Sequence, residues 1–311
     1  MKNKFLIMFF AFSFLLSPKV GFASAAMQLS VGNISVYYAE QDKHIAELAA
    51  KTVNRQQQHL YEQYALEQNP MIIYIAQNAS QYRQYSGSSS PLWSMGLASN
   101  DRMLVKSPSF SHQTLTAFRK TLIHETVHLA VTSYDLPVWF NEGLAQYEAG
   151  QFSITQKTLL SRAAWSDRFI PFRDIEYLIQ MPAAKAKLAY AQSVAAVDYM
   201  IDYFGVELVA KLLYLIKKYE HFSTGFRNAF LMSPEAFEKK WQENSKKHYR
   251  IYLLLDTGSI FWIPLTVLFV LGYVLTRYRR KKLLKRWEQE ERENNLLSNK
   301  GDIIVKNDVD I

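Results

Sequence analysis

The chain has no cysteine among its 311 residues. A disulfide framework, a thiolate metal site and a cysteine nucleophile are therefore excluded, so any metal ion would have to be held by His, Asp or Glu. The sequence also lacks a P-loop, a dinucleotide-binding glycine fingerprint and the G-x-S-x-G sequence of many serine hydrolases. No internal repeat is present. These absences argue against nucleotide-dependent and cysteine-based chemistry.

The positive charge of the chain is concentrated at its two ends. The formal net charge is +8, of which +3 comes from lysines in the first 25 residues. Residues 277–311 add another +3, from ten basic and seven acidic side chains, so only +2 remains between the ends. Because a nucleic-acid-binding domain carries its basic residues on the folded part itself, we do not expect a nucleic-acid partner.

One motif stands out in the middle of the chain. His124-Glu125-x-x-His128 is followed, fourteen residues after the second histidine, by Glu142. Residues four apart lie on one face of a helix, so the two histidines can bind one metal ion. Glu125 lies about 100° away around the helix, which suits a base that acts on water rather than a metal ligand. The spacing of neighbouring apolar residues predicts a helix over residues 112–132, capped by Ser111.

A second stretch comes shortly after this motif and carries a family resemblance. Residues 136–147 read LPVWFNEGLAQY. Together with the first motif, they resemble the peptidase MA-like proteins of the gluzincin class of metallopeptidases, over most of residues 34–241. The resemblance implies a zincin-like fold, with Zn²⁺ held by His124, His128 and Glu142 and with Glu125 as catalytic base. Asp135 and Glu148 are the alternative carboxylates if Glu142 is not the third ligand.

Two further positions bear on the chemistry that the resemblance implies. Thermolysin-like members have Asp four residues after the glutamate ligand, where it binds the first histidine, but this chain has Gln146 there. The orienting partner of His124 is therefore open. Tyr190 lies where gluzincins often have an oxyanion-stabilising side chain. It is either such a catalytic group or a buried tyrosine whose hydroxyl is satisfied within the fold.

The overall pattern predicts an α+β protein. Residues 26–150 are expected to form a zincin-like part with a small mixed sheet and the metal-bearing helix, and residues 151–250 a helical subdomain. Strands are predicted over residues 33–39, 71–76, 93–98 and 102–106, and Trp139 and Phe140 are expected in the core. Residues 96–98 are either a sheet edge that receives a peptide substrate or an ordinary edge hairpin.

The two ends of the chain predict export and membrane attachment. Residues 1–25 have the charged start, apolar run and A-x-A site of a signal peptide, and an uncleaved anchor is the alternative. Residues 259–276 carry no charge and are long enough for a transmembrane helix. The basic residues directly after them make 277–311 a cytoplasmic tail by the positive-inside rule. We therefore expect a single-pass protein of a bacterial cell membrane with its main domain outside the cytoplasm.

The sequence as a whole predicts a membrane-anchored zinc metallopeptidase that hydrolyses peptide bonds of a peptide or protein substrate outside the cytoplasm. Two alternatives remain open. The domain could bind zinc without hydrolysing anything and serve as an adaptor, or it could be an exported structural domain without metal. The sequence does not indicate an oligomeric state.

Overall fold

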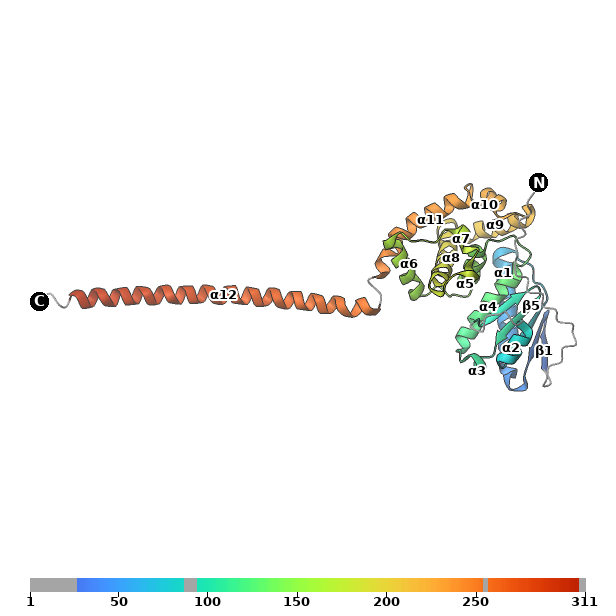
Figure 1. Ribbon diagram of the computed structural model, residues 1–311, viewed down its shortest axis with the longest axis horizontal. Helices are drawn as coiled ribbons and strands as arrows, with labels where there is room; N and C mark the ends of the chain where they lie inside the picture. Colours follow the sequence, from blue (N-terminus) through green and yellow to red (C-terminus); the bar gives the residue numbers. More distant parts are fainter. Residues whose placement is uncertain (1–26, 87–93, 254–256, 308–311) are drawn as a thin grey trace. The chain divides into compact units, whose positions relative to one another are not determined.

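The computed structural model describes residues 27–86, 94–253 and 257–307, and side chains are described for these residues except 251, 253, 257–261 and 294–307. The predicted signal peptide of residues 1–25 lies outside the described residues. The chain divides into two units, one ending at Tyr252 and the other beginning at Leu253 (Figure 1). The predicted division between residues 26–150 and 151–250 stays a prediction.

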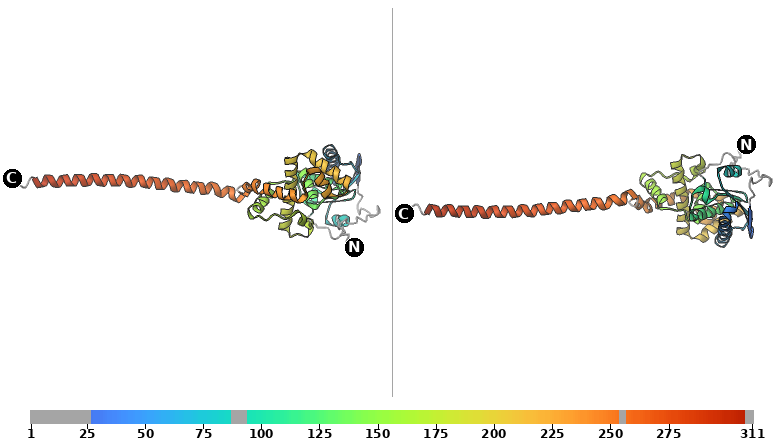
Figure 2. Two further views of the ribbon diagram at one scale, coloured as in Figure 1. Left: turned by 90° about the horizontal axis from the view of Figure 1, so that it is seen from above. Right: turned by 90° about the horizontal axis from the view of Figure 1, so that it is seen from below.

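A five-stranded mixed sheet forms one end of the first unit (Figures 1 and 2), which confirms the predicted small mixed sheet with one strand more than the four predicted. The strand order is β1-β2-β3-β5-β4, in which β2, β3 and β5 run parallel and the outer strands pair antiparallel. β4 therefore forms one edge of the described sheet. The strand bounds are β1 Met27–Val31, β2 Ile34–Tyr38, β3 Met71–Ala76, β4 Gly96–Ser99 and β5 Arg102–Lys106. β1 was not predicted.

Helices cover both faces of this sheet because its side chains alternate. The helices α1 (Lys43–Tyr64) and α4 (Leu115–Ala130) pack their apolar side chains on one face, with core residues that include Ile73, Val105 and Leu122. The short helix α2 (Ala79–Ser86) packs its tyrosines on the other face. α4 begins at Leu115 because Thr114 accepts a hydrogen bond from Ala117 N, so the predicted cap at Ser111 is wrong. Ser111 instead ends α3 (Pro108–Ser111).

A helical core occupies the other end of the unit (Figure 2). Its helices are α5 Val138–Glu148, α6 Ile154–Ser166, α7 Phe172–Ile175, α8 Ala183–Phe204, α9 Val206–Tyr219, α10 Phe222–Phe230 and α11 Pro234–His248. Short 3₁₀ turns lie at Leu178–Gln180 and Arg250–Leu253, and a third, Glu40–Asp42, directly precedes α1. Trp139 and Phe140 are buried in this core, which confirms the prediction for both. Trp139 stacks on Phe172 with ring centroids 4.4 Å apart.

α5 and α8 approach each other closely at a glycine. A Cβ atom at Gly143 would overlap the backbone oxygen of Ser193 and would lie 2.7 Å from Val197 Cγ2, so no larger residue fits between the two helices. This contact fixes α5 against α8 one residue after Glu142.

The second unit is the single helix α12 (Thr257–Asn307). Among the residues whose side chains are described, no helix is both long enough and apolar enough to cross a membrane. The predicted transmembrane helix of residues 259–276 begins at side chains that lie outside the described part, and it is not confirmed.

Candidate metal centre

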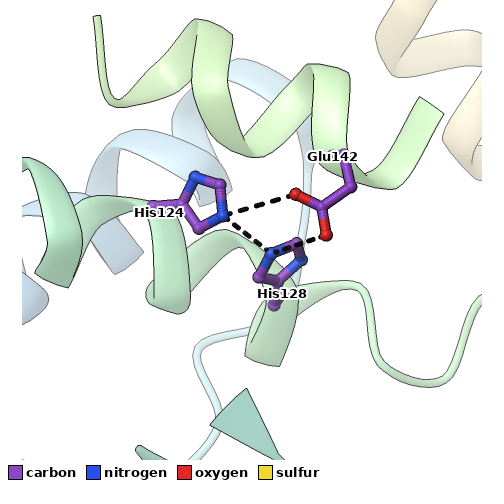
Figure 3. A group of neighbouring side chains, drawn as sticks. All are labelled: His124, His128 and Glu142. Carbon is purple, nitrogen blue, oxygen red and sulfur yellow. Dashed lines mark hydrogen bonds and ion pairs between the residues drawn. The ribbon is translucent and has the colours of Figure 1, made fainter. Parts of the chain in front are cut away.

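His124 and His128 lie one turn apart on α4 and turn the same ring nitrogen toward each other (Figure 3). Their Nε2 atoms are 3.0 Å apart, and their rings are nearly perpendicular, with an interplanar angle of 83°. The spacing of four residues therefore brings both imidazoles to one point, as the sequence predicted.

Glu142 comes to the same point from α5. Its two carboxylate oxygens lie 3.6 Å from His124 Nε2 and 3.8 Å from His128 Nε2 (Figure 3). One ligand atom from each of the three residues lies within 4.8 Å of the other two. α5 is held in place by the close contact at Gly143 and by Glu176, whose Oε1 accepts a hydrogen bond of 2.9 Å from Val138 N at the start of the helix.

The two alternative carboxylates have other partners. Asp135 accepts a hydrogen bond from Phe222 N at 3.2 Å. Glu148 accepts one from the Tyr64 hydroxyl at 2.6 Å and lies 2.9 Å from His59 Nε2, which ties the end of α5 to α1. Neither belongs to the group of residues around His124 and His128.

Carboxamide oxygens set the tautomer of both histidines. Gln151 Oε1 lies 3.1 Å from His124 Nδ1, and Asn141 Oδ1 lies 2.9 Å from His128 Nδ1. A carboxamide oxygen accepts, so these contacts are made by a ring protonated at Nδ1, and in the neutral form of that ring Nε2 presents a lone pair. Two lone pairs 3.0 Å apart repel each other unless a proton or a cation lies between them. With the Glu142 carboxylate beside them, this donor set fits a divalent cation that prefers nitrogen and oxygen ligands.

Glu125 is buried beside this centre, against the edge strand β4. A Cβ atom at Gly96 would lie 2.7 Å from Glu125 Oε1 and 2.9 Å from Thr121 Cγ2, so Gly96 provides the space that the carboxylate occupies. Burial raises the pKa of Glu125 to about 7; the nearby charge of His128 opposes this shift and that of Glu142 adds to it. The side chain is therefore a carboxyl group that can accept a proton near neutral pH.

Comparison with known proteins gives the family. Residues 53–247 match the Peptidase MA superfamily, and this stretch includes α4, α5 and most of the helical core. The chain belongs to the peptidase MA superfamily. It is also similar to the "Uncharacterized protein YhcO" of Bacillus subtilis (strain 168), with 23% identity over an alignment of 243 residues that covers 68% of this chain and 70% of that protein. Membership suggests a peptidase, and the His-His-Glu group agrees with the metal dependence typical of this superfamily.

Tyr190 of this peptidase MA-type domain lies on α8 and is partly buried. Burial raises the pKa of its hydroxyl, and the charges of Glu142 and Glu125 raise it further. The hydroxyl is thus protonated at neutral pH and within electrostatic reach of both carboxylates. Its role stays a prediction.

This chain has Gln146 where thermolysin-like members have the Asp that binds the first histidine, and the structure shows which residue contacts His124 instead. Gln146 is bonded to other groups: its Nε2 donates to Tyr190 O at 3.2 Å, and its Oε1 accepts from Gln156 Nε2 at 2.8 Å. Gln151 is the residue that contacts His124 instead. Sequence reasoning missed Gln151, although Gly150 directly before it is a signal for a turn after a helix.

Proposed function

We propose that the chain is a zinc metallopeptidase of the gluzincin type that hydrolyses peptide bonds outside the cytoplasm. One observation carries the proposal: the Nε2 atoms of two imidazoles and one carboxylate converge on one point, with all three ligand atoms within 4.8 Å of one another. Two histidines and one glutamate are the protein ligands of several catalytic zinc sites, which keep a fourth position open for water or substrate. His124, His128 and Glu142 would hold the ion.

A bound Zn²⁺ supplies Lewis acidity, which polarises a carbonyl group and lowers the pKa of water. Glu125 is proposed to accept a proton from the attacking water and to deliver it to the leaving amine. Its burial beside Gly96 supports this role, because the surrounding atoms hold the carboxyl group in one position and raise its proton affinity. The Tyr190 hydroxyl is proposed to donate a hydrogen bond to the developing oxyanion.

The edge strand β4 is the proposed platform for the substrate backbone. β4 pairs with β5 on one side, and it packs on α4 through the contact between Gly96 and Glu125. An extended peptide that adds to the free side of such an edge forms backbone hydrogen bonds that do not depend on its sequence. The peptide would then run past the general base.

We also propose that the domain is exported and anchored in the membrane of a bacterial cell. The support comes from the sequence: residues 259–276 carry no charge, and residues 277–286 contain seven Lys and Arg. An uncharged stretch of this length is sufficient for a bilayer core, and basic residues directly after it favour a cytoplasmic location for the C-terminal segment. The apolar start of the chain would direct the first unit to the other side.

Replacement of Glu125 by glutamine tests this function. Glu125→Gln keeps the shape of the side chain but removes its capacity to accept a proton, so we expect loss of hydrolysis with unchanged metal content and thermal stability at least equal to that of the wild type. The measurement is cleavage of a broad peptide library by mass spectrometry, together with elemental analysis of the purified full-length protein. Full activity in Glu125→Gln would remove the general-base assignment, and a wild-type protein that binds zinc but cleaves nothing would favour the adaptor hypothesis.

A further inference from the structure

The chain turns sharply at the end of α5 and brings Gln151 back toward α4. Gly150 adopts a left-handed conformation with φ of 58°. Gly150 N donates to Tyr147 O at 3.0 Å, and Gln151 N donates to Gln146 O at 2.9 Å. This pair of hydrogen bonds is the Schellman motif, which ends a helix and reverses the direction of the chain.

A lysine on α4 holds this turn in place. Lys120 donates a hydrogen bond from Nζ to Gly150 O. Lys120 lies four residues before His124, so it is on the same face of α4 as the histidine. The turn is thus attached to the helix that carries the metal ligand, one residue before Gln151 reaches His124 Nδ1.

The carboxamide of Gln146 makes its hydrogen bonds to other groups. It donates to backbone oxygens at Glu142 and Tyr190 and accepts from Gln156, whose side chain also caps the start of α6 together with Ser153. These contacts join α5 to α6 and α8. Gln146 therefore stabilises the helical core, and Gln151 is the residue aimed at the metal ligand.

We propose that Gln151 is the positioning residue of His124: the capped end of α5 delivers a neutral carboxamide that holds His124 in its Nδ1-protonated tautomer, ready to bind a metal ion through Nε2. The metal-binding part of this inference depends on the proposed function. The tautomer part does not, since it concerns the metal-free protein.

Because the Gln151 side chain is uncharged, it affects the basicity of His124 less than a carboxylate would. A carboxylate that accepts from Nδ1–H makes the imidazole a stronger donor to a metal ion, whereas a carboxamide orients the ring with less effect on its basicity. Asn141 does the same for His128. Both histidines are therefore oriented by uncharged acceptors, and Glu142 is the only ligand that brings a negative charge.

Three variants of the full-length protein distinguish an orienting role of Gln151 from a purely structural one. Gln151→Ala removes the acceptor, Gln151→Glu replaces it with a stronger one, and Gln146→Ala is the matched control that removes a carboxamide from the same part of the chain. We expect Gln151→Ala to weaken zinc binding by roughly 10- to 100-fold, as measured by competition with a chromophoric chelator. Gln151→Glu should bind zinc at least as tightly as the wild type, and Gln146→Ala should lower the melting temperature without weakening zinc binding.

The second measurement needs no metal. Long-range ¹H–¹⁵N spectra of the metal-free protein with labelled histidines should show His124 protonated at Nδ1 in the wild type and as a mixture of tautomers in Gln151→Ala. The same tautomer ratio in both proteins would overturn the proposal. If the wild type bound no zinc at all, the proposed function would fail, and the tautomer spectra would still decide whether Gln151 orients His124.

Discussion

Replacing Gly96 with alanine adds a single methyl group, and we expect that group to displace the carboxylate of Glu125. The added methyl group of Gly96→Ala would lie 2.7 Å from Glu125 Oε1, 2.8 Å from Glu125 Cγ and 2.9 Å from Thr121 Cγ2. Carbon atoms pack at about 3.5 Å or more, so the carboxylate oxygen would have to move by roughly 0.8 Å or the strand would have to shift away from α4. Glu125 is buried, with 7% exposure, and it has little free space to move into.

Both the stability and the rate should respond to this overlap. Adding a methyl group to a close-packed interior costs about 1–3 kcal/mol, so we expect the free energy of unfolding to fall by that amount. Displacement of a catalytic group by about 1 Å can cost on the order of 100-fold in rate, so we expect kcat to fall roughly 10- to 100-fold. Zinc binding should be unchanged, because the nearest atoms to the added methyl group belong to Glu125 and Thr121 and not to the three proposed ligands.

The assay compares Gly96→Ala with the wild type and with two other variants. Urea unfolding gives the stability, and initial rates on a peptide found by library cleavage give kcat. Ser99→Ala changes the same strand away from Glu125 and should match the wild type in both. The double variant Gly96→Ala/Thr121→Ser removes one of the overlapping methyl groups and should regain part of the stability but little of the rate. Unchanged stability and rate in Gly96→Ala would refute the assigned packing of Glu125 against β4.

Three further predictions concern the charged and hydroxyl groups of the site. Glu142→Ala should abolish stoichiometric zinc binding by elemental analysis, whereas Glu148→Ala should keep the zinc and lower the melting temperature; the reverse pattern would exchange their roles. The pKa of Glu125 is raised from 4.5 to about 7, so in the metal-free protein this carboxyl group favours folding below about pH 4.5 and progressively loses that contribution up to about pH 7. Glu125→Gln should therefore gain stability over the metal-free wild type by up to about 3 kcal/mol as the pH rises through this window, and parallel curves of urea midpoint against pH would contradict the shift. Tyr190→Phe should lower kcat by roughly 10²- to 10³-fold with unchanged KM and zinc content if its hydroxyl stabilises the oxyanion; an unchanged kcat would assign Tyr190 to the fold alone.

The sequence predicted the local parts of the site because helical spacing alone determines them. His124 and His128 lie four residues apart, and any regular helix brings them together. The mixed sheet was predictable for a similar reason, since alternation in residues 34–38 and the apolar run of residues 71–76 are short-range signals. Glu142 is a long-range part of the site, and its place beside the histidines was expected from the family resemblance of residues 136–147 rather than from helical spacing.

The missed parts depend on contacts that no local pattern encodes. Gln151 reaches His124 only because Gly150 is left-handed and Lys120 binds its carbonyl oxygen, and the sequence does not show which of two nearby glutamines turns inward. β1 was overlooked although its apolar and polar residues alternate; it is short and largely exposed, and it is defined mainly by pairing with β2. The cap of α4 was misplaced by three residues because Ser and Thr are both favoured cap residues, and Ser111 is already the last residue of α3.

The contact between Gly143 and Ser193 has a consequence for the order in which the protein matures. The histidine pair is complete once residue 128 has been synthesised, and Glu142 is added soon afterwards. α5 is also held by Glu176 and by α1, but its close contact at Gly143 needs α8, so the carboxylate is not fully fixed until about 50 further residues have emerged and folded. If His124, His128 and Glu142 hold a metal ion as proposed, its capture would be a late event of biogenesis, and a chain truncated before α8 would retain the ion less well even with all three residues present.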